Sequence, residues 1–97
     1  MATKEWTVRI HLVEDGTVTR ARAELTAPGS SMKVLGHGTA RRNPIDRPVP
    51  EIGDELAAGR ALEDLALRVH DVAVDDLVEL AGPVDTVRRD LPAWWSP

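Results

Sequence analysis

The stretch "ARRNPIDRPVPEIGDELAAGRALEDLA", from Ala40 to Ala66, joins a stiff connection to an amphipathic helix and decides the fold. Its first part, "RNPIDRPVP", contains three prolines, which remove backbone donors and hold the preceding residues in extended geometry. A helix can begin at Pro50, because the missing N–H is not needed in a first helical turn. We expect this segment to be a structural loop that fixes the direction of the helix, through Asn43, Pro44, Asp46, Pro48, Pro50 and Gly53.

Beyond the loop, apolar residues recur at steps of three and four, which predicts one apolar stripe of a long helix. The stripe consists of Ile52, Leu56, Gly59, Leu62, Leu65 or Ala66, and Val69. A helical glycine costs about 1 kcal/mol relative to alanine, so Gly59 predicts a close approach to the sheet or to another backbone. The helix is expected to end near Val69–Asp71, and "VDDLVELAG" predicts a short second helix from Asp75 to Gly82-Pro83.

Three strands are predicted before the loop. In "EWTVRIHLV", Trp6, Val8, Ile10 and Leu12 alternate with polar residues, which is typical of a half-buried strand. Asp15-Gly16 then predicts a hairpin turn into "TVTRARAEL", whose Thr19, Ala21, Ala23 and Leu25 share one face. After a turn at "TAPGSSM", a third strand follows in "KVLGHGTAR". Its Gly36 and Gly38 suggest a bulge or a close backbone approach.

The predicted fold class is therefore α+β. A three-stranded antiparallel sheet packs on one long helix, with a short C-terminal helix after it, in the order β-β-β-α-α. Residues 1–82 form the single domain, and residues 83–97 are expected to be a loosely ordered tail.

Composition agrees with one small globular domain. The chain has 97 residues, of which 42% are hydrophobic and 29% charged, and it contains no cysteine. No apolar signal-peptide core and no run of about 18 apolar residues is present, so we expect a soluble cytoplasmic protein without a membrane partner.

The net charge of −4 is unevenly distributed. Residues 1–50 carry eight Lys or Arg and five acids, whereas residues 51–97 carry four Arg and eleven acids. This asymmetry indicates a basic face, which could bind RNA phosphates, or two ordinary solvated surfaces. The candidate RNA-binding or ribosome-binding residues are Arg9, His11, Arg20, Arg22, Arg41, Arg42 and Arg47.

The sequence offers little chemistry beyond this face. It has no GxxxxGK[ST] phosphate loop, and His11, His37 and His70 lie on separate elements without metal-ligand spacing. The acids Asp54, Glu55, Glu63 and Asp64 fit a solvated helix face. We therefore predict no enzyme, no catalytic residues, no metal, no cofactor and no small-molecule substrate.

A homodimer is predicted because one helix cannot cover all the apolar surface of such a sheet. Candidate dimer surfaces are Val34 or Leu35, the region around Ala57, Ala61 and Leu67, and Trp94-Trp95. Alternatively, the short helix near Leu77 and Leu80 folds back and completes the core of one chain.

The segment "GHGTARRNPIDRPVPEIGDELAAGRALEDLA" resembles a family of small actinobacterial domains of unknown function, several of them associated with dormancy and hypoxic stress. The hairpin "WTVRIHLVEDGTVTRARAEL" is also similar to the opening of that family. Known members have an α+β fold likened to the double-stranded-RNA-binding-domain class and, as dimers, have been likened to ribosome hibernation-promoting factors. The resemblance implies a stress factor that binds the ribosome or structured RNA. The alternative is a homodimeric protein-interaction module with no nucleic-acid partner.

Overall fold

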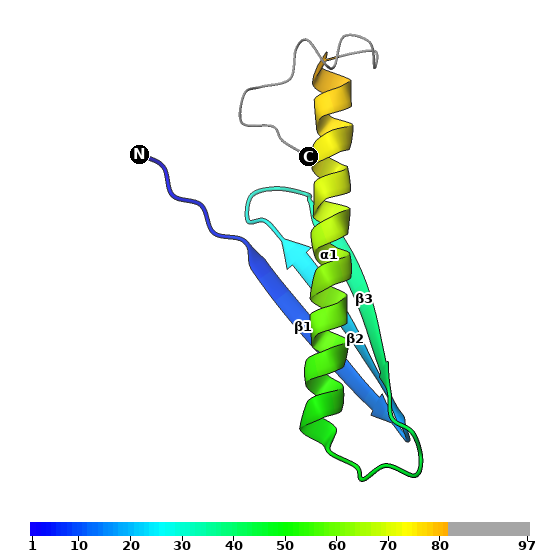
Figure 1. The fold of residues 1–97 in the computed structure, drawn as a ribbon. Helices are drawn as coiled ribbons and strands as arrows, with labels where there is room; N and C mark the ends of the chain where they lie inside the picture. Colours follow the sequence, from blue (N-terminus) through cyan, green and yellow to red (C-terminus); the bar gives the residue numbers. More distant parts are fainter. Residues whose placement is uncertain (82–97) are drawn as a thin grey trace.

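Three antiparallel strands form one sheet, and a single long helix crosses one of its faces (Figure 1). The computed structural model describes residues 1–81. The strands are β1 (Thr7–Asp15), β2 (Val18–Thr26) and β3 (Lys33–Arg41), with β2 in the centre, and the helix is α1 (Pro50–Ala81). The predicted α+β class, the three strands and the long helix are confirmed.

Two glycines make the tight connections between the strands possible. Gly16 has a φ of 62° and is the first residue of a two-residue loop between β1 and β2, as in a type II′ hairpin. The turn therefore lies one residue later than the predicted Asp15-Gly16. Between β2 and β3, Gly29 has a φ of 76° and the N–H of Ser30 donates to the carbonyl of Ala27 at 3.1 Å. Pro28 before a glycine of positive φ is the pattern of a type II turn.

The helix rests directly on two glycines of β3. A Cβ at Gly38 would collide with the carbonyl oxygen of Ala57 and the backbone nitrogen of Ala61. A Cβ at Gly36 would likewise collide with the backbone of Ala61 and Leu65. The close backbone approach predicted at these glycines is confirmed. The core is accordingly made of small residues, with Ala21 and Ala23 of β2 opposite Ala57 and Ala61 of α1.

This packing explains why the predicted helix stripe was right at Leu65 and Val69 but wrong at its other positions. Ile52, Leu56 and Leu62 are 53%, 46% and 42% exposed, whereas Ala57, Ala61 and Leu65 are buried. A Cβ at Gly59 would meet no atom within 4 Å, so the close approach expected there does not occur. Because the glycines draw the two backbones together, alanines fit between helix and sheet, and Ile52, Leu56 and Leu62 lie outside.

The helix is also longer than predicted. It continues through Asp71–Asp75 to Ala81, a total of 32 residues, so the short second helix expected from Asp75 is the last part of α1. The sequence between Val69 and Ala81 contains no glycine or proline to end the helix. The predicted domain boundary at 82 and the tail 83–97 lie outside the described residues.

The loop between β3 and α1 is held by one arginine, Arg42. The guanidinium of Arg42 donates to the carbonyl oxygens of Asn43 and Pro44, each at 3.4 Å, and to that of Asp46 at 2.7 Å. The Asn43 side-chain oxygen accepts the N–H of Ile45 at 3.2 Å, as in an Asx turn. Pro50 is the first helical residue, as predicted, and Ile52 N donates to the Val49 carbonyl at 3.1 Å.

Strand β1 is left without cover on the helix side. Its Val8, Ile10 and Leu12 are opposite Leu25, Ala23 and Ala21 of β2, so they share the face on which the helix lies. The helix packs on β3 and β2 and touches β1 only marginally, and these three side chains remain 42%, 36% and 44% exposed. Trp6, just before the strand, is 53% exposed.

This arrangement changes the set of possible dimer surfaces. Ala57, Ala61 and Val34 belong to the core, so those three predicted dimer positions were wrong. Leu35 is half-buried, Leu67 is 66% exposed, and Trp94-Trp95 lies outside the described residues. Within residues 1–81, no helix has the length and apolar character that spanning a lipid bilayer requires.

Candidate nucleic-acid interface

The sheet face opposite the helix gathers the basic side chains of all three strands. Since the buried positions of β2 are Thr19, Ala21, Ala23 and Leu25, its even-numbered residues lie on the other face. Pairing then places His11, Arg22 and His37 side by side across β1, β2 and β3. The neighbouring rows are Val13, Arg20 and Thr39 on one side and Arg9, Glu24 and Leu35 on the other.

The outer sheet face carries an excess of positive charge. It has five cationic side chains (Arg9, Arg20, Arg22, Lys33 and Arg41) and two acidic ones (Asp15 and Glu24), a formal excess of three positive charges. All five cationic residues are exposed. Lys33 and Glu24 form an ion pair at 3.7 Å, and the arginines of this face make no ion pair among the described residues. The guanidinium groups are therefore available to an external anion.

The helix has the opposite charge. Between Pro50 and Ala81 it carries nine acids and two arginines, a formal excess of seven negative charges. α1 lies on one side of the sheet (Figure 1), and the five cationic side chains lie on the other, so the charge asymmetry along the sequence becomes an asymmetry in space. A polyanion on the outer sheet face is separated from the acids of α1 by the thickness of the sheet.

Five of the seven predicted site residues lie together on this face, namely Arg9, His11, Arg20, Arg22 and Arg41. Arg42 does not, because its guanidinium is occupied by the loop carbonyls described above. Arg47 lies in the same loop, beside the first turn of the helix. These two residues therefore stand apart from the sheet group.

Sequence reasoning missed two members of the face, His37 and Lys33. Both lie on β3 at positions that alternate with the buried Val34, Gly36 and Gly38. The period of two was readable in "KVLGHGTAR", but the glycines weakened the pattern because they contribute no apolar side chain to it.

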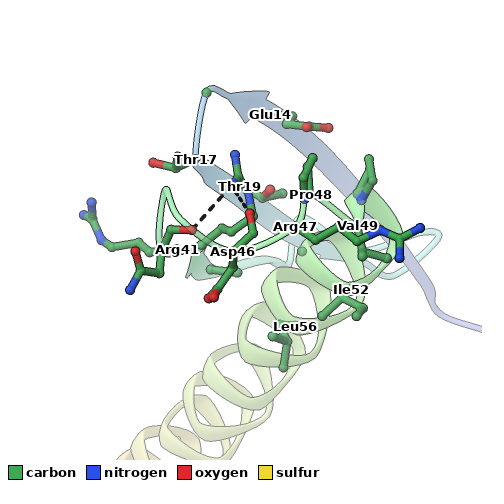
Figure 2. A pocket seen from close by; sticks show the side chains of 16 residues that line it. Glu14, Thr17, Thr19, Arg41, Asp46, Arg47, Pro48, Val49, Ile52 and Leu56 are labelled. Atoms are coloured by element: carbon green, nitrogen blue, oxygen red, sulfur yellow. Dashed lines mark hydrogen bonds between the residues drawn. The ribbon is translucent and has the colours of Figure 1, made fainter.

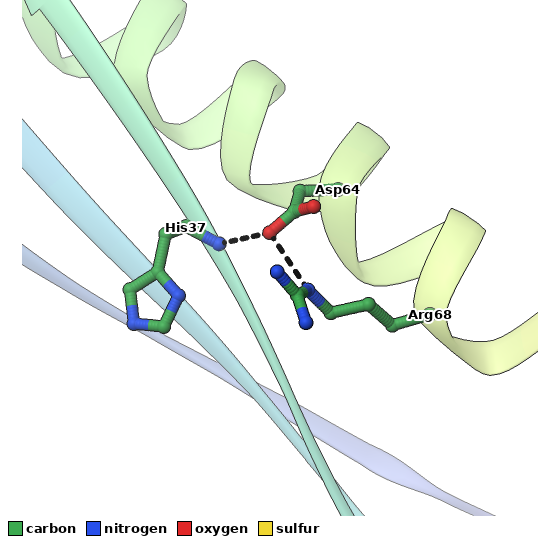
Figure 3. Close-up of polar contacts among 3 residues, drawn as sticks. All are labelled: His37, Asp64 and Arg68. Atoms are coloured by element: carbon green, nitrogen blue, oxygen red, sulfur yellow. Dashed lines mark hydrogen bonds and ion pairs between the residues drawn. The ribbon is translucent and has the colours of Figure 1, made fainter. Parts of the chain in front are cut away.

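The free edge of β3 is closed by side chains from the helix. The N–H of His37 donates to Asp64 Oδ2 at 2.8 Å, and Arg68 Nε donates to the same oxygen at 3.1 Å (Figure 3). The carbonyl of Thr39 accepts a hydrogen bond from Arg60 at 2.7 Å. The His37 hydrogen bond, followed by that from Arg68, holds the pKa of Asp64 below the ordinary aspartate value of 3.8. The imidazole of His37 points away from this cluster.

The described residues do not form a recognisable metal centre. In residues 1–81, no three His, Asp or Glu side chains are grouped closely enough to hold a metal ion. The arrangement that the sheet presents is an open surface of hydrogen-bond donors and positive charge, which is suited to binding an anionic partner.

This architecture, a three-stranded sheet with one covering helix and a basic open face, defines a small α+β class of domain. The family model described as Rv2632c-like matches residues 4–85, and the chain belongs to that family. Its relatives include the uncharacterized protein MT1780 of Mycobacterium tuberculosis (strain CDC 1551 / Oshkosh), which is 46% identical over 74 residues, 76% of this chain and 77% of that protein.

The uncharacterized protein Rv2632c of Mycobacterium tuberculosis (strain ATCC 25618 / H37Rv) is 48% identical over 59 residues, 61% of each chain. A solved structure, the crystal structure of Rv2632c, matches with a TM-score of 0.75 and 34% identity over 86% of this chain and 96% of the other. The names of these relatives assign no catalytic activity.

Proposed function

We propose that this chain is a non-enzymatic, cytoplasmic stress and dormancy factor. It binds structured RNA, and the ribosome in particular, through its outer sheet face. The observation that carries the proposal is the separation of charge, with five cations on one sheet face and nine acids on the helix behind it. Arginine forms bidentate contacts with phosphate, and arginines spread over one sheet face can contact several phosphates of a structured RNA.

Structured RNA is favoured over single-stranded RNA. Proteins that bind single strands stack bases on exposed aromatic side chains. The outer face, as built from β1, β2 and β3, has no Phe, Tyr or Trp, and Trp6 precedes β1 on the side of Val8 and Ile10. Recognition would therefore rest on the shape of the RNA and on phosphate contacts.

Co-sedimentation with purified ribosomes at two salt concentrations tests this proposal. Binding through phosphate contacts releases counterions, so the fraction of protein in the pellet should fall steeply between about 50 and 200 mM salt. Absence of the protein from the pellet at low salt, or sedimentation that does not respond to salt, would argue against the basic face as an RNA-binding surface.

The second candidate function is a homodimeric interaction module, and the uncovered side of β1 favours it. β1 is an edge strand with apolar side chains exposed toward the helix side, whereas the other edge of the sheet is closed by Arg60 and Asp64. Edge strands left open are templates for pairing with another chain. Two copies that pair along β1 would cover Ile10 and its neighbours. The two functions are compatible, since pairing along the edge of β1 leaves the arginines on the outer face exposed.

A further inference from the structure

A cavity of about 360 Å³ lies where the hairpin turn, the loop after β3 and the first turns of α1 meet (Figure 2). Its size is within the range of small-molecule sites. The cavity is separate from the rows of arginine and histidine on the outer sheet face, and only Arg41 belongs to both. It is therefore a candidate site independent of the proposed RNA interface.

The walls of this cavity are held in place by main-chain contacts. Arg42 fixes the loop through three carbonyl oxygens, and its own N–H donates to the Thr17 carbonyl at 2.8 Å, which ties the loop to the hairpin. The N–H of Asp46 donates to the carbonyl of Asn43 at 2.9 Å. A cavity with such walls exists before a ligand arrives, which lowers the entropic cost of binding.

The wall of the cavity includes one buried residue whose hydroxyl has no protein partner among the described residues. Thr19 is 7% exposed and is the only buried polar residue among residues 1–81. Its side chain makes no hydrogen bond among the described residues, and the hydroxyl is accessible rather than sealed in the core, since no fully buried side-chain N or O atom of these residues lacks a partner. A Cβ at Gly53 would stand 3.0 Å from the Thr19 Oγ1, so the missing side chain at Gly53 leaves the hydroxyl open to the cavity.

The surroundings of Thr19 favour an anionic group. The first turn of α1 borders the cavity. Pro50 has no N–H and the N–H of Ile52 already donates to the Val49 carbonyl, so this turn favours an anion through the helix dipole rather than through several free donors. Arg47 also lines the cavity and makes no ion pair or hydrogen bond among the described residues. The charged residues of the lining are Arg41, Arg42, Arg47, Glu14 and Asp46, a formal excess of one positive charge.

The remaining wall is apolar. Val49, Ile52 and Leu56 border the cavity and are 39%, 53% and 46% exposed, although large aliphatic residues of an amphipathic helix usually face the core. We infer that this cavity binds a small carboxylic acid with an apolar body. The carboxylate accepts a hydrogen bond from the Thr19 hydroxyl and lies near Arg47 and the start of α1. The apolar body packs on Ile52 and Leu56.

A titration of the full chain followed by ¹⁵N–¹H correlation spectra tests this inference. The probe is 3-phenylpropionate, and the matched neutral probe is 3-phenylpropanamide. With 3-phenylpropionate we expect saturable shifts of the backbone N–H signals of Thr19, Val49 and Gly53. Binding of 3-phenylpropanamide should be at least tenfold weaker. Equal binding of the two probes, no saturable shift, or shifts confined to the exposed side of β1 would overturn the inference.

Four variants make the test specific to the site. Thr19→Val removes the hydroxyl and keeps the shape, and Arg47→Gln removes the charge. Each should weaken binding of 3-phenylpropionate at least fivefold. The ¹⁵N–¹H spectrum of each variant should otherwise match that of the unmodified chain. Gly59→Ala, where no atom lies within 4 Å of the added methyl group, is the control and should bind as the unmodified chain does. Unchanged affinity in both Thr19→Val and Arg47→Gln would reject the site. Arg20→Gln, on the sheet face, should not alter acid binding, so this result separates the cavity from the RNA proposal.

Discussion

Asp64 of the helix accepts the backbone N–H of His37 at 2.8 Å and thereby closes part of the free edge of β3. One turn earlier on α1, Arg60 donates to the carbonyl of Thr39, the next residue but one on the same edge. Blocking an edge in this way prevents unwanted strand pairing. The two edges of the sheet are thus unequal, and β1 is the edge left for a second strand.

Replacing Asp64 by asparagine should remove part of the pH dependence of stability. Because the folded-state pKa is below the ordinary value of 3.8, the carboxylate stabilises the fold fully above that value. This contribution disappears as the pH falls through the lowered folded-state pKa. Asp64→Asn should therefore lower stability at neutral pH and flatten its decline in acid, as measured by urea unfolding from pH 7 to pH 2. Asp75→Asn, on the exposed part of the helix, is the control, and an identical acid decline in both variants would contradict this role.

Two glycine-to-alanine changes should have opposite effects. Gly38→Ala places a methyl group against the backbone of Ala57 and Ala61, so the helix must shift, and stability should fall by about 3 kcal/mol or more. Gly59→Ala adds a methyl group in open space within a helix and should stabilise by about 0.5–1 kcal/mol. Denaturant titration compares the two. A neutral Gly38→Ala would mean that helix and sheet are farther apart than in this structure.

Replacing Arg42 should lower the stability of the fold, because its side chain holds the loop between β3 and α1. Arg42→Met keeps the aliphatic stem and removes the donors to three loop carbonyls, so we expect stability to fall by about 1–2 kcal/mol and amide exchange to be faster from Asn43 to Ile52. Arg47→Met, in the same loop but without such hydrogen bonds among the described residues, should change stability by less than about 0.5 kcal/mol. Equal stability of the two variants would show that the loop does not depend on Arg42.

The strands could be predicted from the sequence because each has a clear local signal. The alternation in β1 and β2 and the turn residues around Gly16 and Gly29 are properties of neighbouring residues, and β3 was placed with the same bounds. The contact face of the helix could not be predicted in this way. Ile52, Leu56 and Leu62 form the more hydrophobic stripe, but the sheet selected Ala57 and Ala61, because its glycines allow the backbones to approach closely.

The candidate site was partly predictable for the same reason. The alternation of side chains along each strand is enough to place four residues on the outer face: Arg9, His11, Arg20 and Arg22. The structure adds His37 and Lys33 to this face through the register of β3. The cavity beside Thr19 depends on tertiary contacts between the hairpin, the loop and α1, which are far apart in the sequence. The sequence therefore contained no signal for it.

A charge placed on the uncovered side of β1 should prevent dimer formation. Ile10→Lys puts an ammonium group among Val8 and Leu12, whereas Val13→Lys adds the same charge on the outer face of the same strand. Light scattering at micromolar concentration should give twice the 10.6 kDa of one chain for the unmodified protein and for Val13→Lys. It should give a single chain for Ile10→Lys. A monomeric unmodified protein would contradict the dimer, and a dimeric Ile10→Lys would move it to another surface.

Binding of structured RNA by the outer sheet face can be measured through the salt dependence of affinity for duplex RNA. The unmodified chain is compared with the triple variant Arg9→Gln, Arg20→Gln, Arg22→Gln and with Arg47→Gln outside the face. We expect the slope of log affinity against log salt to become shallower by about 1 for each phosphate that the triple variant no longer neutralises, and to stay unchanged in Arg47→Gln. An unchanged affinity and slope in a folded triple variant would contradict the claim.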